Sequence, residues 1–117
     1  MGCGLDMKIL SRIRRIICFR TSGNEISYSE AMKIRKECEN SVLLDVRSRQ
    51  EYDEGHLPGA ICIPVYELAS NVTKIITDRD AVIICYCQCG SRSRKASKIL
   101  DDLCYSNVYI IKGGLNG

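Results

Sequence analysis

Apolar and polar residues alternate along the chain in a way that separates short strands from longer helices. Short apolar runs bounded by turn-forming residues are typical of strands. They occupy residues 41–46, 61–63, 81–86 and 107–111. The segments between them favour helices, which we predict over residues 27–38, 64–76 (in one or two pieces) and 92–103. Strands that alternate with helices predict an α/β domain with a largely parallel sheet.

Two of these segments show which surfaces are buried. The run at 81–86 is apolar without alternation, which is typical of a central strand covered on both faces. The helix predicted after it has one apolar face, formed by Ala96, Ile99, Leu100 and Leu103. We therefore expect this strand and this helix to pack together in the core.

Polar residues mark where some elements begin. Ser27 and Glu30 have the spacing of a capping box, in which each residue caps the backbone of the other at the start of a helix. Arg47 and Glu51 are four positions apart, so we expect them to pair across one short helical turn. Residues 55–60 read as a turn that leads into the strand at 61–63.

The length and the N-terminal pattern suggest one domain with an arm. The 117 residues can form one compact core but not two ordinary domains. We assign residues 1–25 to a basic amphipathic arm and residues 26–117 to the domain. The arm has Ile9, Ile13, Ile16 and Ile17 at helical spacing. We favour packing of this helix on the domain over contact with a membrane surface.

Net charge and cysteine content limit which binding partners and which cellular compartment we expect. Residues 1–20 carry a net charge of +4 and the remainder −1, so the domain itself has no electrostatic footprint for nucleic acid. The eight cysteines accompany a normal core composition and no cleavable signal pattern, which favours reduced thiols and a cytoplasmic protein. No apolar run approaches the roughly 20 residues that span a bilayer.

The candidate chemistry lies between the strand at 81–86 and the helix at 92–103. The connecting loop can point its backbone N–H groups at one spot, and the positive end of the helix dipole points there too. A cysteine in that position, with Arg92 beside it, is expected to favour the reactive thiolate. Gly90 suits a sharply curved loop. His56 is the only histidine and lies in a turn, so we interpret it as structural and assign activation of the thiol to the loop.

A metal site is the less favoured interpretation of the same loop. Cys85, Cys87 and Cys89 alternate, and thiolates do bind soft metals. Structural zinc sites instead use cysteine pairs separated by two to four residues, and a second ligand cluster is missing from the sequence. We therefore predict no metal and no cofactor, with Cys85 a buried strand residue.

The loop and three further motifs resemble the rhodanese family. Residues 87–93, Cys-Gln-Cys-Gly-Ser-Arg-Ser, are similar to the family's active-site loop, Cys-x-x-Gly-x-Arg/Thr. The segments 43–47, 51–52 and 55–60 resemble the family's two upstream motifs in order and spacing, and residues 112–115 resemble its closing motif. Family members usually continue with a Trp after the Gly-Gly turn, so we expect the natural chain to extend slightly beyond Gly117.

The resemblance implies a fold, a chemistry and a set of residues. The fold would be the rhodanese fold, a mostly parallel five-stranded sheet with helices on both faces. The chemistry would be transfer of sulfane sulfur through a persulfide on Cys87. Asp45 and Arg47 would brace the loop. Substrate would be bound by Gln88, Cys89, Gly90, Ser91 and Arg92. The partners would be a small anionic sulfur donor and a thiol acceptor, either a thioredoxin-like protein or a low-molecular-weight thiol.

Four alternatives can be compared with this interpretation. Related phosphatases have five residues between cysteine and arginine, whereas Cys87 and Arg92 are separated by four, which argues against a phosphatase. Cys89 and Arg94 are also separated by four, and this register stays open. So does the role of Cys89 as a resolving thiol. The other functional class is a non-catalytic interaction module built on the same fold.

Overall fold

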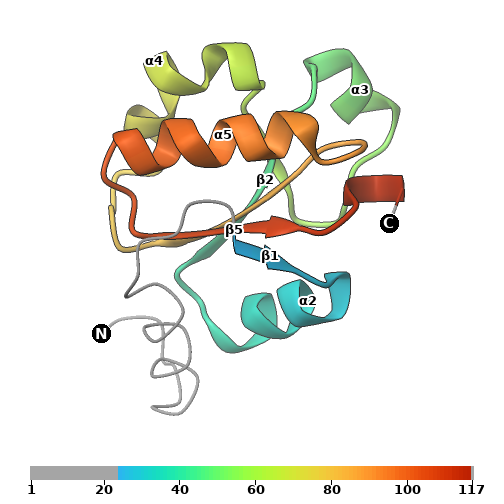
Figure 1. Ribbon diagram of the computed structural model, residues 1–117, viewed down its shortest axis with the longest axis horizontal. Helices are drawn as coiled ribbons and strands as arrows, with labels where there is room; N and C mark the ends of the chain where they lie inside the picture. The colour runs from blue at the N-terminus through green and yellow to red at the C-terminus, as the bar shows by residue number, and fades with distance from the viewer. Residues whose placement is uncertain (1–23, 117) are drawn as a thin grey trace.

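The structure is a computed structural model that describes residues 24–116. Its centre is one sheet of five parallel strands in the order β1-β5-β4-β2-β3 (Figure 1). The strands are β1 (Asn24–Ile26), β2 (Ser41–Asp45), β3 (Ile61–Cys62), β4 (Val82–Tyr86) and β5 (Asn107–Ile111). The expected arm, residues 1–25, lies almost wholly outside the described residues.

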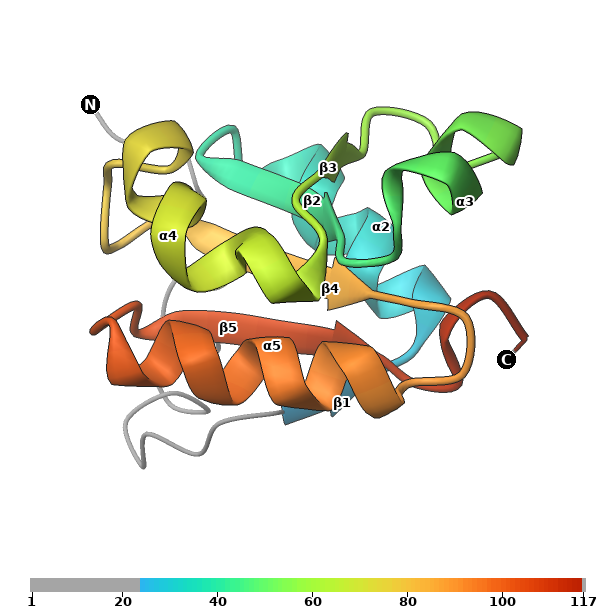
Figure 2. The same cartoon turned by 90° about the horizontal axis from the view of Figure 1, so that it is seen from above.

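Helices cover both faces of the sheet, as expected. They are α2 (Tyr28–Glu37), α3 (Arg49–Glu54), α4 (Val65–Ile75), α5 (Ser91–Asp102) and a short 3-10 helix, η1 (Gly114–Asn116). α4 and α5 lie side by side on one face, and α2 lies on the other (Figures 1 and 2). This arrangement confirms the predicted mostly parallel five-stranded sheet with helices on both faces.

The two faces of each inner strand supply two apolar clusters. Leu44 packs toward α4 and α5, and its neighbour Leu43 packs toward α2, because successive side chains of a strand point to opposite faces. All five residues of β4 are buried, which confirms the prediction of a central strand. Within the described residues, no helix is long and apolar enough to cross a membrane.

One strand lacks a clear signal in the sequence. β1 was not located from the sequence, because it has three residues and only Ile26 among them is apolar and buried. Its strand conformation depends on pairing with β5, about 85 residues further along the chain, where Ile26 lies opposite Ile111. Residues 65–75 form a single helix, one of the two forms expected for residues 64–76. The capping box at Ser27 and Glu30 is present as predicted.

Candidate functional site

The loop predicted to carry the chemistry lies at the carboxyl end of the sheet. β4 ends at Tyr86 and α5 begins at Ser91, so residues 87–90 form the connection, seen beyond the β4 arrowhead in Figure 2. β2 lies next to β4 and ends in Asp45 at the same edge. Ligands of open α/β sheets bind at this edge, where loops from neighbouring strands meet.

The sulfur of Cys87 is held inside this loop. The Gly90 N–H donates a hydrogen bond to Sγ at 3.0 Å, and Ser93 Oγ lies 3.6 Å from the same sulfur. Gly90 has φ +105°, in the left-handed region that favours glycine, and this conformation leads the loop into the start of α5. Cys87 itself is only 1% exposed. Cys89 is exposed and Gln88 is half-buried.

The environment of the loop favours the Cys87 thiolate. Burial raises the pKa of Cys87, but hydrogen bonds from the Ser93 side chain and from the backbone of Ser93, Gly90 and Arg92 outweigh it and lower the pKa overall. Cys85, two residues earlier, is buried as well, and there burial raises the pKa to about 12. Hydrogen bonds to the sulfur lower the pKa of Cys87, whereas Cys85 is more deeply buried and burial dominates its pKa.

The Arg92 guanidinium forms an ion pair with a carboxylate from α3. Its two terminal nitrogens bond the two oxygens of Glu51 at 2.6 and 3.1 Å, and both side chains are about one-third exposed. This pair raises the pKa of Arg92 and lowers the pKa of Glu51 to about 2. Glu51 also caps α3 through Ser48, so one carboxylate fixes both the helix start and the guanidinium.

The expected pairing of Arg47 with Glu51 is wrong, because each residue has a different partner. Arg47 pairs with Asp45 at 2.8 Å, and both side chains are buried, at 5% and 0% exposure. The Arg47 guanidinium also donates to the Gly55 carbonyl. Next to this pair, the Val46 N–H donates to the carbonyl of Tyr86, the residue before Cys87. Asp45 and Arg47 therefore lie at the carboxyl end of β2, beside the loop.

The closing turn of the chain packs against the back of the loop. The Leu115 N–H donates to the Cys87 carbonyl at 3.0 Å. Gly114 has φ +58°, and a Cβ on it would lie 2.2 Å from the same carbonyl oxygen. A side chain at this position is therefore excluded both by its conformation and by contact with the loop.

Comparison with known proteins agrees with this geometry. The family model for the rhodanese-like domain matches residues 11–117. The chain belongs to the rhodanese family. A sulfurtransferase of Allochromatium vinosum is 32% identical over 92 residues, which cover 79% of this chain and 84% of that protein.

Two further proteins that are similar to this chain differ in length and in name. The structure of a human single-domain sulfurtransferase matches with a TM-score of 0.69 at 26% identity, covering 79% of this chain and 91% of the human one. A tRNA uridine(34) hydroxylase of Buchnera aphidicola is 39% identical over 122 residues and covers 95% of this chain. The chain spans only 38% of that hydroxylase, so it corresponds to part of a longer protein there.

Sequence reasoning missed four contributors to this rhodanese site. They are Glu51 as the partner of Arg92, Ser93 beside the sulfur, and Gly114 and Leu115 behind the loop. Ser93 follows Arg92 directly and lies one helical turn after Gly90. This position in the sequence is the signal that could have placed Ser93 near the loop. His56 stacks on Tyr52 and bonds the Tyr52 carbonyl, a structural role as predicted.

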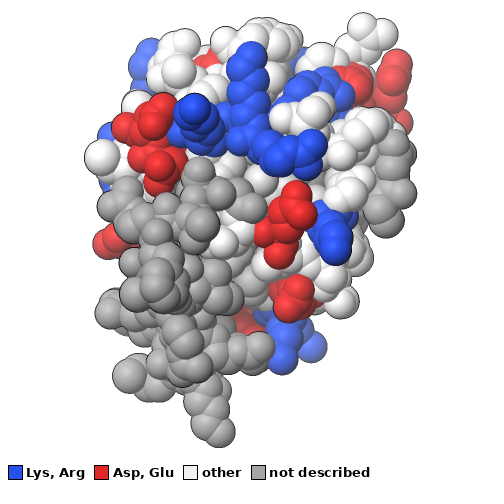
Figure 3. All heavy atoms as spheres, viewed as in Figure 1, with Lys and Arg blue, Asp and Glu red and all other residues white. Residues whose placement is uncertain are grey.

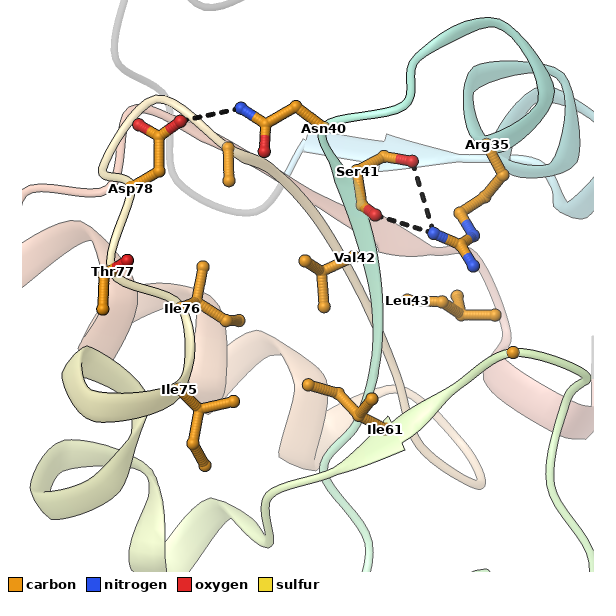
Figure 4. Close-up of a pocket in the computed structure, with 12 residues that line it drawn as sticks. Arg35, Asn40, Ser41, Val42, Leu43, Ile61, Ile75, Ile76, Thr77 and Asp78 are labelled. Atoms are coloured by element: carbon orange, nitrogen blue, oxygen red, sulfur yellow. Dashed lines mark hydrogen bonds between the residues drawn. The ribbon is translucent and has the colours of Figure 1, made fainter. Parts of the chain in front are cut away.

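Two hollows elsewhere in the domain lie outside the loop. One, of about 550 Å³, is lined by Ser27, Tyr28, Leu57 and the closing turn 112–115. The other, of about 330 Å³, opens at the amino end of β2 (Figure 4). There Arg35 bonds Ser41, and Asn40 bonds Asp78. Neither lining contains a cysteine, and no group of three metal-binding side chains occurs among residues 24–116.

Proposed function

We propose that this rhodanese domain is a sulfurtransferase that carries sulfane sulfur as a persulfide on Cys87. The observation that carries the proposal is the hydrogen bonding of the Cys87 sulfur, which favours its thiolate in a buried site. The thiolate is the nucleophilic form of cysteine. The same ring of N–H groups suits the negative charge of a persulfide or of an oxyanion such as thiosulfate.

The reaction has two steps. In the first, the Cys87 thiolate attacks the outer sulfur of thiosulfate, a polysulfide or a small persulfide, a new S–S bond forms, and the donor leaves as sulfite or a thiolate. In the second, an acceptor thiolate or cyanide attacks the terminal sulfur, and the bonding electron pair returns to Cys87 Sγ. Because Cys87 is only 1% exposed, a donor can reach Sγ only after a local rearrangement of the residues around it.

Basic side chains next to the loop support an anionic donor. Arg94, Lys95 and Lys98 are exposed on α5, and Figure 3 shows basic side chains gathered over this helix. Arg94 lies 3.5 Å from Glu25, which offsets part of its charge. Such a field raises the local concentration of anions. We propose a thiol acceptor, either thioredoxin-like or of low molecular weight, and a cytoplasmic setting in which the cysteines stay reduced.

The mass of the intact protein tests the proposal. Incubation with thiosulfate or polysulfide should add the mass of one sulfur atom, and cyanide or a reductant should remove it. Cys87→Ser should abolish the adduct, whereas Cys104→Ser, which removes an exposed thiol at the other end of α5, should retain it. An adduct that survives Cys87→Ser and disappears in Cys89→Ser would assign the chemistry to the other register. No adduct in any form would favour the non-catalytic interaction module.

A further inference from the structure

Ser93 has two hydrogen-bonding contacts and one hydroxyl proton to serve them. Its side chain is fully buried, in the first turn of α5. Oγ lies 2.9 Å from the Gly90 carbonyl oxygen, to which it donates, and 3.6 Å from Cys87 Sγ. When Cys87 is a thiol, its S–H donates to Ser93 Oγ, and the Ser93 O–H donates to Gly90. Both contacts are then satisfied.

The contacts conflict when Cys87 becomes a thiolate. A thiolate has no proton, so it can only accept a hydrogen bond, and the Gly90 carbonyl is likewise only an acceptor. Two acceptors then compete for the single Ser93 O–H. A hydrogen bond to a charged acceptor is roughly twice as strong as one between neutral groups, so the O–H turns from the carbonyl to the sulfur.

We propose that the Ser93 hydroxyl is a switching hydrogen-bond donor that stabilises the Cys87 thiolate as the leaving group when sulfur is delivered to the acceptor. This inference rests on the proposed function, and it adds a catalytic residue to the loop amides. In the persulfide, Sγ bears no charge and the terminal sulfur bears it. The hydroxyl then returns to the Gly90 carbonyl, about 3 Å away.

The bonds that form and break in the delivery step define when the Ser93 hydroxyl changes its acceptor. The acceptor thiolate forms a bond to the terminal sulfur, the bond between that sulfur and Sγ breaks, and the electron pair moves to Sγ. No net proton is taken up when acceptor and product are both ionised. The O–H of Ser93 follows the charge to Sγ but keeps its proton. Rotation about one side-chain bond is sufficient, because both acceptors lie within reach of the same oxygen.

The structure offers a matched control for this serine. Ser97 lies one turn further along α5 and is 1% exposed, and its Oγ is without a hydrogen-bond partner in the described residues. Ser93→Ala and Ser97→Ala therefore remove the same buried atom from the same helix. Only the first removes a group in contact with the reactive sulfur.

The pH profile of Cys87 alkylation by iodoacetamide, read on the peptide that contains it, tests the thiolate half of the inference without sulfur transfer. Ser93→Ala should move the midpoint to higher pH and slow alkylation at neutral pH on the order of ten-fold. At high pH the alkylation rate of Ser93→Ala should reach a plateau that matches or exceeds that of the wild type, because a less stabilised thiolate is the better nucleophile. Ser97→Ala should follow the wild type.

Delivery of a preloaded persulfide to cyanide in a single turnover tests the other half, and Ser93→Ala should slow it on the order of ten-fold. An unchanged midpoint with a lowered plateau would show a structural role and overturn the proposal, as would equal effects of the two alanine variants. If the wild type accepts no sulfur at all, the proposed function fails, while the alkylation profile still decides whether Ser93 stabilises the thiolate.

Discussion

The Leu115 N–H donates to the carbonyl of Cys87 at 3.0 Å, so the last turn of the described chain holds the backbone of the residue that carries the sulfur. The turn approaches this closely because Gly114 has no side chain. The Gly-Gly pair at 113–114 is thus part of the site, although it lies more than 20 residues from the loop in sequence.

Gly114→Ala should displace the loop and slow both alkylation and sulfur loading of Cys87 by at least ten-fold. The added Cβ would lie 2.2 Å from the Cys87 carbonyl oxygen and would hold a left-handed φ of +58°. Backbone strain of this kind costs about 1–3 kcal/mol, which urea unfolding would detect.

Gly55→Ala is the matched control for that experiment. Gly55 has φ +154°, also unfavourable for a side chain, but its Cβ would meet nothing within 4 Å. This variant should lose stability and keep Cys87 reactivity near that of the wild type. Similar loss of reactivity in both variants would contradict a specific contact between the closing turn and the loop.

Glu51→Gln should weaken the attachment of Arg92 and lower stability at neutral pH by about 1 kcal/mol, a value typical of a partly exposed pair. The pKa of Glu51 is lowered by Arg92, from 4.5 to about 2. A carboxyl with a lowered pKa stabilises the fold above its unfolded pKa and loses this contribution as pH falls through its folded pKa.

The stability difference between wild type and Glu51→Gln should therefore be constant above about pH 5 and shrink between about 4.5 and 2. Urea unfolding of both proteins across this range measures it. Glu67→Gln, which breaks the more exposed pair with Arg49, serves as the comparison and should cost less. A difference that persists unchanged to pH 2 would show that the Glu51 charge is not involved.

Asp45→Asn should be the most destabilising of the substitutions considered, by about 3–5 kcal/mol. It removes the charge that faces Arg47 in a site where both side chains are buried, and an unpaired buried guanidinium is costly. Chemical unfolding measures the effect. A loss below about 1 kcal/mol would mean that solvent reaches Arg47 in solution.

The sequence predicted the local part of this site well and the distant part poorly. Cys87, Gly90 and Arg92 belong to one strand-loop-helix segment, so their order along the chain determined their arrangement. Glu51 was assigned to Arg47, which is four residues away, whereas its partner Arg92 is 41 residues away. Which arginine pairs with Glu51 depends on how α3 packs against the loop. The spacing of residues along the chain contains no information about this packing.

Other features of the fold and the site also depend on contacts between residues far apart in the sequence. Three residues of β1 carry too weak a pattern, and only pairing with β5 makes them a strand. The closing motif at 112–115 was recognised by resemblance, but its hydrogen bond to Cys87 required the fold. Ser93 was visible in the sequence as a helix residue, and its role depended on knowing that its hydroxyl points back at the sulfur.

If Cys87 carries one sulfur atom, a single turnover should release one sulfur atom per chain. The protein is loaded with polysulfide, freed of excess donor and treated with cyanide, and the thiocyanate released is counted per chain. Persulfide chemistry on Cys87 predicts about one equivalent from the wild type and from Cys104→Ser, and none from Cys87→Ser. Thiocyanate released in equal amount by Cys87→Ser, or none released by the wild type, would contradict it.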